Sequence, residues 1–229
     1  MINNKGIIMK IAMYFVAALL VGCGGPSGPR GDTGAIGATG PQGVPGTSVT
    51  PSPVPSESAV QVMVDNENAY RLNVGQEPLT PGLTCNLYTV PNTTTAIIGA
   101  TSLVSVGAFG YHGVFNQAVT NTSAGLNVLP AALQSVYQTW YILKCTGQLV
   151  VSDDNWHEFD LTSDDGSNLY LDGLLINNDG IHSSQTKTGA KYIKYGFHSF
   201  EIDELQGAGQ ESFILNEDGA VMSSNGFYH

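Results

Sequence analysis

Glycine stands at every third position from Gly25 to Gly46, and no other feature of the sequence restricts the fold as strongly. The run reads GPSGPRGDTGAIGATGPQGVPG, with proline at several of the positions between the glycines. Three polyproline II strands can wind around one axis only if every third residue lacks a side chain, because nothing larger than glycine fits there. The period therefore predicts a triple helix, and with it a homotrimer. A flexible Gly/Pro linker is the alternative.

The N-terminus has the pattern of an export signal. Lys5 and Lys10 precede the apolar run 11–21, which is too short to span a bilayer. The run ends in Leu-Val-Gly-Cys, and this resembles the lipobox of bacterial lipoproteins. The resemblance implies that residues 1–22 are removed and that Cys23 is acylated, so the chain is held at a membrane by its lipid anchor only. Gly24 follows in place of the Asp that retains lipoproteins at the inner membrane, so we expect the outer membrane and the cell surface. An ordinary secreted protein with a chance cysteine is the alternative.

Four segments follow the signal peptide. Residues 23–46 form the lipidated, collagen-like stalk, and residues 47–58 are a Ser/Thr/Pro-rich linker. Residues 59–81 are predicted to be a neck of two short strands, 59–64 and 70–74, joined by the turn Asp-Asn-Glu-Asn. The remaining residues, 82–229, form the head.

The head is predicted to be all-β, an antiparallel β-sandwich. Apolar and acidic residues alternate around Phe159 and again around Phe200, as in half-buried strands. The strand candidates are short and regularly spaced, at 83–90, 96–106, 141–151, 156–162, 169–176, 190–197, 200–205 and 211–215. Only residues 129–138 are predicted to be helical, so the pattern favours a sandwich or a barrel.

Charge and motifs exclude several classes of function. The net charge is −11, which leaves no basic surface for nucleic acid phosphates. The sequence has no HExxH, GxSxG or P-loop motif, and we expect no enzymatic activity. Acidic, Asn-rich loops do suit a hard cation such as Ca²⁺.

An ordered set of motifs in the head resembles the protective-antigen (PA-14, or PA14) domain family, a lectin-like fold. The set lies mainly between Trp156 and Leu215, with looser matches from Leu83 onward. Its pieces are Ser-Asp-Asp-Gly at 163–166, Leu-Tyr-Leu-Asp-Gly at 169–173, Asn-Asp-Gly at 178–180, Gly-Phe-His at 196–198 and Gln-Gly-Ala-Gly at 206–209. The resemblance implies a β-sandwich and, often, carbohydrate binding.

The resemblance also implies a Ca²⁺ site. In lectins of this family a pair of aspartates joined by a cis peptide bond binds the ion, and here the pair is Asp164 and Asp165. Gln206 and the carbonyl groups of Ala208 and Gln210 match the remaining ligands. The alternative is structural, since Asp-Gly between two strands favours a tight hairpin turn.

Three further assignments follow. Asn177, Asn178 and Asp179 are predicted to turn a hairpin, with a ligand-facing loop as the alternative. The family alignment brings Cys85 near Cys145, which implies a disulfide in an oxidising compartment, with two buried thiols as the alternative. Trp140, Trp156, Tyr111 and Tyr228 are candidates for stacking on sugars, although packing in the core or at an interface is the first expectation for each.

The architecture predicts a surface-anchored trimeric adhesin whose heads bind glycans on a target cell, with Ca²⁺ as cofactor. It is similar to that of the mosaic adhesive trimer proteins of predatory bacteria. A structural or protein-binding surface module is the alternative, and a secreted glycoside hydrolase is the third.

Overall fold

The computed structural model describes residues 57–121 and 125–229. The predicted signal peptide, Cys23, the glycine repeat and most of the linker therefore lie outside the described residues. Within the described ranges, no helix combines the length and the apolar character that crossing a bilayer requires.

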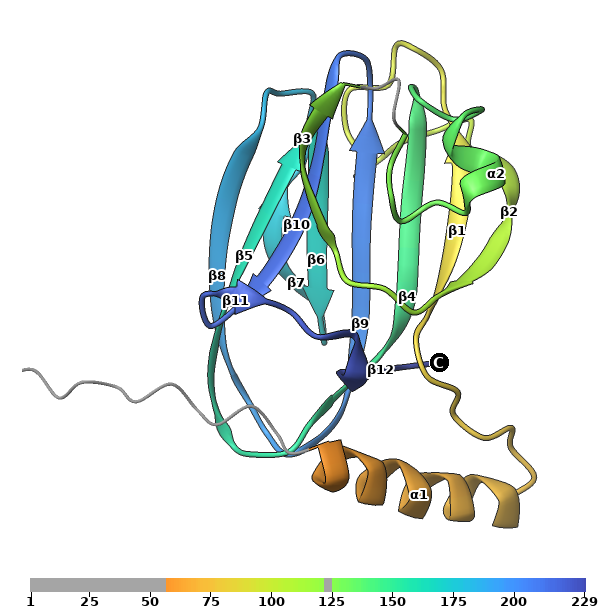
Figure 1. The fold of residues 1–229 in the computed structure, drawn as a ribbon, viewed down its shortest axis with the longest axis vertical. Helices are drawn as coiled ribbons and strands as arrows, with labels where there is room; N and C mark the ends of the chain where they lie inside the picture. The colour runs from red at the N-terminus through yellow and green to blue at the C-terminus, as the bar shows by residue number, and fades with distance from the viewer. Residues whose placement is uncertain (1–56, 122–124) are drawn as a thin grey trace, which may run out of the picture. The chain divides into compact units, whose positions relative to one another are not determined.

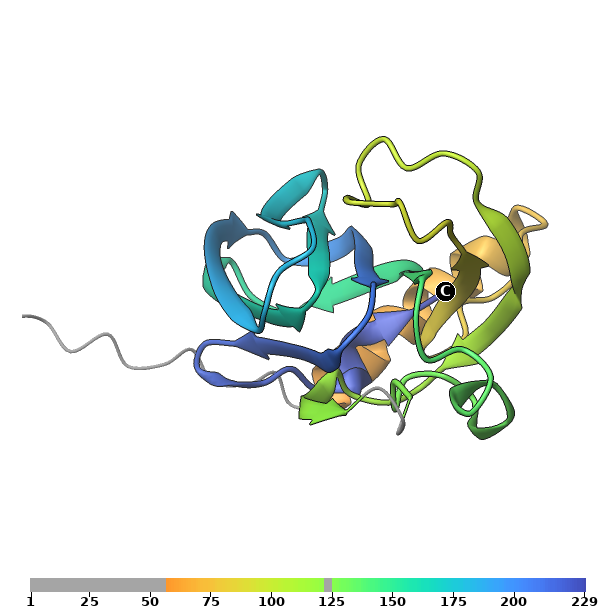
Figure 2. The same cartoon turned by 90° about the horizontal axis from the view of Figure 1, so that it is seen from above.

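Two antiparallel sheets form the head and pack face to face, which confirms the predicted sandwich (Figures 1 and 2). The seven-stranded sheet has the order β2-β1-β4-β9-β6-β7, and β12 pairs with β4. The five-stranded sheet has the order β11-β10-β5-β8, and β3 pairs with β10. The strands of the larger sheet are β1 (Leu83–Thr89), β2 (Val104–Tyr111), β4 (Tyr141–Val151), β6 (Gly166–Leu171), β7 (Leu174–Asn178), β9 (Gly196–Gln206) and β12 (Phe227–Tyr228). Those of the smaller sheet are β3 (Asn116–Asn121), β5 (Asn155–Asp164), β8 (Gln185–Ile193), β10 (Gln210–Glu217) and β11 (Ala220–Val221).

The core lies between the sheets and is built from the alternating strands. Phe159 and Leu161 of β5 are fully buried, whereas Glu158 between two buried positions is exposed. Phe200 and Ile202 of β9 face them from the other sheet and belong to the same apolar cluster. Because successive side chains of a strand point to opposite faces, this burial sets which residues of β5 and β9 lie inside.

A disulfide joins β1 to β4 inside this core. Cys85 and Cys145 lie directly opposite one another in the antiparallel register and are both fully buried. The implied pairing is therefore present, and it closes a loop with a sequence separation of 60 residues.

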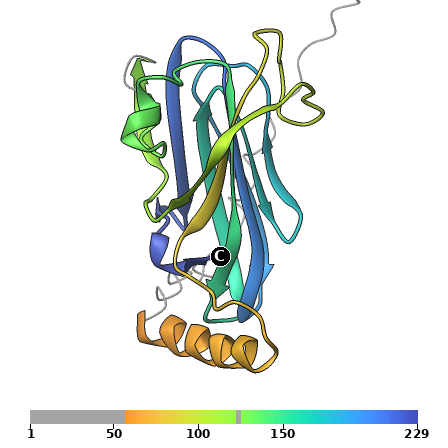
Figure 3. The ribbon, with the colours of Figure 1, turned by 90° about the vertical axis from the view of Figure 1, so that its right-hand side faces the viewer.

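The predicted two-stranded neck is wrong, because this segment is the single helix α1 (Glu57–Asn73), which begins within the predicted linker. The β-branched valines favoured strands, but Val60, Met63 and Val64 follow the i, i+3, i+4 spacing of one helix face and are buried. They pack on Val150 and Tyr228 of the head. Figure 3 shows α1 lying across one end of the sandwich.

The predicted turn inside the neck also has another role. Asn68 lies within α1, where its side-chain oxygen accepts a hydrogen bond from Leu79 N at 2.6 Å and its amide donates to Leu79 O at 3.3 Å. The helix ends at Asn73, and the following turn contains Gly75, whose φ of 75° suits glycine; Gln76 N donates to Arg71 O. The chain thus folds back along α1 before entering β1.

Several strand boundaries also differ from the prediction. The segment 169–176 is two strands, because Asp172 and Gly173 form a turn with positive φ between β6 and β7. The candidate at 190–197 spans the turn between β8 and β9. The candidate at 96–106 overlaps only the start of β2, and β3 has no counterpart in the prediction. The short helix α2 (Ala131–Gln134) lies within the predicted range.

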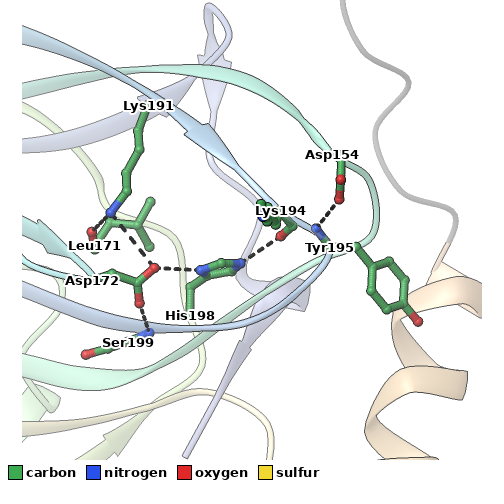
Figure 4. A network of polar contacts seen from close by, with 8 residues as sticks. All are labelled: Asp154, Leu171, Asp172, Lys191, Lys194, Tyr195, His198 and Ser199. Atoms are coloured by element: carbon green, nitrogen blue, oxygen red, sulfur yellow. Dashed lines mark hydrogen bonds and ion pairs between the residues drawn. The ribbon is translucent and has the colours of Figure 1, made fainter.

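A polar network links the β6–β7 turn to the β8–β9 connection (Figure 4). Asp172 accepts hydrogen bonds from Ser199 N at 2.9 Å and from the His198 ring nitrogen Nδ1, which lies 2.6 Å away. The other ring nitrogen of His198 lies 2.7 Å from Lys194 O. Partial burial opposes ionisation of Asp172, but the bonds from His198 and Ser199 outweigh it and lower its pKa.

We expect Asp172→Asn to weaken the acid dependence of stability. A carboxyl whose pKa is lower in the folded state contributes stability above its unfolded pKa of about 3.9, and this contribution is lost as the pH falls through the folded value. Asparagine tolerates the positive φ at this position and has an amide oxygen that can accept from Ser199. Urea unfolding measured at a series of pH values is expected to show a shallower decline below about pH 4 in the variant. Parallel profiles for the two proteins would contradict this role of Asp172.

Candidate functional site

The turn at Asp164–Gly166 carries the chain from one sheet to the other. Asp164 ends β5 in the five-stranded sheet, and Gly166 begins β6 in the seven-stranded sheet. The alternative of a tight hairpin is therefore wrong, because β5 and β6 are not hydrogen-bonded neighbours. The Asp164–Asp165 peptide bond is cis, as the family resemblance implied. A Cβ at Gly166 would lie 2.6 Å from Gly180 O, so only glycine permits the close approach of these two loops.

The two aspartates hold three connections together. Asp164 Oδ2 accepts from Ser184 N at 3.0 Å, and Asp165 Oδ1 accepts from His182 N at 3.1 Å. Asp165 Oδ2 accepts from Gly207 N at 2.8 Å. The β5–β6, β7–β8 and β9–β10 connections thus meet at one end of the sandwich, away from α1 (Figure 1). Both aspartate residues are buried, at 6% and 3% exposed.

The structure brings the predicted ligands of the β9–β10 loop beside this pair. Gln206 Nε2 donates to Gln210 O at 3.0 Å, which orients the amide group. Gln206 Oε1 is buried and has no hydrogen-bond partner within the described chain. A Cβ at Gly207 would lie 2.9 Å from Asp165 Oδ2, so glycine allows the loop to approach the carboxylate. Ala208 is exposed in the same loop.

Sequence reasoning missed Glu204, the most unusual residue of the site. It lies on the same face of β9 as Phe200 and Ile202, so its side chain points between the sheets. The residue is fully buried, and neither carboxylate oxygen has a hydrogen-bond partner among the described residues. Glu211 of β10 is also fully buried, and its Oε1 accepts from Tyr141 Oη at 3.1 Å. The period-two pattern of β9 places Glu204 at an inward position and was the signal that could have revealed it.

Negative charge at this end of the sandwich is not balanced by basic side chains. Burial raises the pKa of Asp164 and Asp165. Burial, followed by repulsion from Glu211, holds the pKa of Glu204 well above its ordinary value. Burial raises the pKa of Glu211 to about 7. No lysine or arginine forms an ion pair with any of these four carboxyl groups within the described ranges.

These residues fit a calcium ion. Ca²⁺ takes six to eight oxygen ligands, from carboxylates, side-chain amides and backbone carbonyls. Asp164 and Asp165 supply carboxylate oxygens, and Gln206 supplies a buried amide oxygen that has no other partner. A bound cation would also favour the ionised form of Glu204, whose carboxylate oxygens have no hydrogen-bond partner among the described residues. The site offers more oxygen acceptors than donors, as a hard cation requires.

The three residues at 177–179 have different surroundings in the structure. Asn178 is buried at the end of β7, and its amide donates to Ser163 Oγ at 2.9 Å. Asp179 accepts from Ile97 N at 2.6 Å and from Ile98 N at 2.9 Å, so it anchors the loop before β2. Asn177 is exposed. The predicted hairpin is wrong, because β7 and β8 belong to different sheets. A role of these residues in ligand binding stays a prediction.

The four aromatic candidates have different surroundings. Tyr228 is buried against α1, Tyr111 packs against Phe115, and Trp140 packs against the loop before β2. Trp156 is 65% exposed and meets the edge of Tyr192, so it does not pack in the core of this chain, and its packing at an interface stays a prediction.

Comparison with known proteins identifies the fold. No protein-family model matches the sequence, and no curated protein matches it. The PA14 domain of the MpAFP antifreeze protein is similar in structure, with a TM-score of 0.54 and 16% identity over 66% of this chain and 91% of that one. The PA14 sugar-binding domain from an RTX adhesin has a TM-score of 0.51 and 17% identity over 66% of this chain and 99% of that one. The head therefore has the fold of a PA14-type domain.

Proposed function

We propose that the protein is a trimeric adhesin, anchored at the outer membrane, whose PA14-type head binds cell-surface glycans in a calcium-dependent manner. The observation that carries the proposal is the set of buried oxygen atoms around Asp164 and Asp165, with which no lysine or arginine among the described residues forms an ion pair. The fold supports it, because one of the similar structures is described as a sugar-binding domain from an RTX adhesin.

The protein's own residues would hold and orient the ion. The backbone N–H groups of Ser184, His182 and Gly207 fix the two aspartates, so these carboxylates need no rearrangement to bind a cation. Gln206 is oriented by its bond to Gln210 O. When bound, Ca²⁺ supplies open coordination positions that sugar hydroxyl oxygens can fill.

The position of the site suits display at a surface. The loops that hold the aspartates lie at the end of the sandwich opposite α1, and α1 follows the linker and the repeat in sequence (Figure 1). A trimer would present three such loops, and linked weak sites raise avidity through effective concentration. Binding without catalysis is therefore the activity that we propose.

The first prediction concerns the aspartate pair. Asp164→Asn and Asp165→Asn each remove a charge and keep an amide oxygen, so we expect loss of calcium-dependent glycan binding in both variants. A glycan array probed with and without a chelator measures this. Asp160→Asn is the matched control, because Asp160 lies on the same strand and contacts Thr188 on the outer face.

Two outcomes on the array would contradict the proposal. Equal glycan binding with and without chelator would remove the calcium requirement. An absence of glycan binding in every condition, together with capture of a defined protein partner, would favour a protein-binding module instead.

The second prediction concerns Glu204. Glu204→Gln replaces a buried, unpartnered carboxylate with a neutral group of similar shape, so we expect the calcium-free protein to gain about 1–2 kcal/mol in free energy of unfolding. We expect calcium to stabilise the variant less than the wild type, because part of the attraction for the cation is lost. Urea unfolding with calcium and with chelator measures both effects.

Glu201→Gln is the matched control for this experiment. Glu201 lies on the same strand but on the opposite face, where its carboxylate is part-exposed and lies 3.6 Å from Lys144. A calcium-free Glu204→Gln protein that is less stable than the wild type would contradict the account of Glu204.

The third prediction concerns the oligomer. The glycine repeat requires three chains, so light scattering of the protein carrying Cys23→Ser, which cannot be acylated, is expected to give three times the subunit mass. A single-subunit mass at every concentration would contradict the trimer.

A further inference from the structure

A second group of ligand-type side chains lies far from the aspartate pair. His157 is near the start of β5, and Glu217 and Asp218 are at the end of β10, where the chain turns into β11. Asp164 is seven residues further along β5, which at ~3.3 Å per residue puts roughly 20 Å between the two places. Figure 1 shows the β10–β11 turn in the half of the sandwich nearer α1.

The three side chains converge on a small volume. His157 Nδ1 lies 2.9 Å from Glu217 Oε1 and 3.8 Å from Asp218 Oδ2. One ligand atom from each residue lies within 4.8 Å of the other two. Zinc is held at about 2.0–2.2 Å from nitrogen and oxygen ligands, so its ligands lie about 3–3.5 Å from one another. The observed separations bracket this spacing, and small side-chain movements would complete a site.

The backbone holds the ligands in position before any ion binds. Asp218 N donates to Glu158 O at 2.8 Å, and Glu158 N donates to Asp218 Oδ1 at 3.0 Å. This leaves Asp218 Oδ2 as the oxygen that faces the imidazole. A ligand carboxylate with one oxygen fixed by an N–H group is the usual arrangement of protein metal sites. His157 packs in a stacked arrangement on Phe159, which restricts its ring.

The solvent exposure of the three side chains suits a metal site that is open on one side. The His157 side chain is 8% exposed, whereas those of Glu217 and Asp218 are 26% and 34% exposed. The buried imidazole therefore forms the floor of the group, and the carboxylates open it to solvent. An ion can enter from that side, and water can fill the remaining coordination positions.

We propose that His157, Glu217 and Asp218 form a second metal site, which takes a transition-metal ion of the zinc class. The imidazole decides the class, because calcium and magnesium prefer all-oxygen ligands, whereas one nitrogen with two carboxylates suits Zn²⁺ or Co²⁺. The ion would tie the start of β5 to the β10–β11 turn. The site is independent of the calcium proposal, since it shares no residue with it.

Calorimetric titration of the purified protein with Zn²⁺, in buffer containing calcium, tests the proposal. We expect one saturable Zn²⁺ site per chain. His157→Gln and Asp218→Asn are each expected to weaken it by about tenfold or more. Asparagine tolerates the positive φ of 50° at position 218, so this variant guards against a folding defect in the first.

His198→Gln is the matched control. His198 also contacts an aspartate, Asp172, at 2.6 Å, but it has no second carboxylate facing it among the described residues. We expect this variant to bind Zn²⁺ as the wild type does. Co²⁺ supplies a second readout, because its visible absorption reports coordination by the protein and its binding is expected to quench the fluorescence of the adjacent Trp156.

Two results would overturn the proposal. The first is the absence of saturable Zn²⁺ binding to the wild type, which would leave His157 and Glu217 as a simple ion pair. The second is Zn²⁺ affinity that His157→Gln and Asp218→Asn leave unchanged, which would place the ion elsewhere on the protein.

Discussion

The passage of the chain between the two sheets at Asp164–Gly166 is the constraint on which the rest of the site depends. At this point the chain leaves the five-stranded sheet and enters the seven-stranded sheet, with no hairpin between them. The turn has room only because Gly166 and Gly207 let neighbouring loops approach closely. Its two carboxylates accept N–H groups from those loops, so the same interaction that closes this end of the sandwich also fixes the aspartates.

This arrangement concentrates negative charge where the core would otherwise be apolar. Phe200 and Ile202 continue the apolar interior along β9, and the next inward positions are Glu204 and Gln206. A buried carboxylate without a partner costs free energy, and a sequence retains it most readily when something outside the chain compensates. The buried carboxyl group of Glu204 is thus consistent with a cation, and the exposed residues 208–210 of the adjacent β9–β10 loop are accessible to a ligand from solvent.

Local patterns in the sequence were enough to find the sandwich but not its connections. The alternation around Phe159 and Phe200 identified β5 and β9, because period-two burial is a property of neighbouring residues. Which sheet a strand joins depends on distant partners, so the hairpin predicted at Asn177–Gly180 and the hairpin alternative at Asp164–Gly166 are both wrong. Segment 57–73 was wrongly predicted as strands because its residue preferences disagree with its tertiary packing. Its valines favour strands, but a helix lets three of its apolar side chains pack on the head, and tertiary packing overrode propensity.

Some residues of the candidate site could be predicted from the sequence, and others could be found only in the structure. Asp164, Asp165 and Gln206 came from the resemblance to a family, and the structure joins Asp165 to Gly207, the next residue after Gln206. Glu204 and the group at His157 appear only when the fold brings separate strands into contact.

The most direct test of the account is X-ray diffraction from crystals of the protein grown with calcium, using anomalous scattering to locate the ion. The account predicts an anomalous peak in contact with Asp164, Asp165 and Gln206. A map without a peak there, in calcium-saturated crystals, would contradict it.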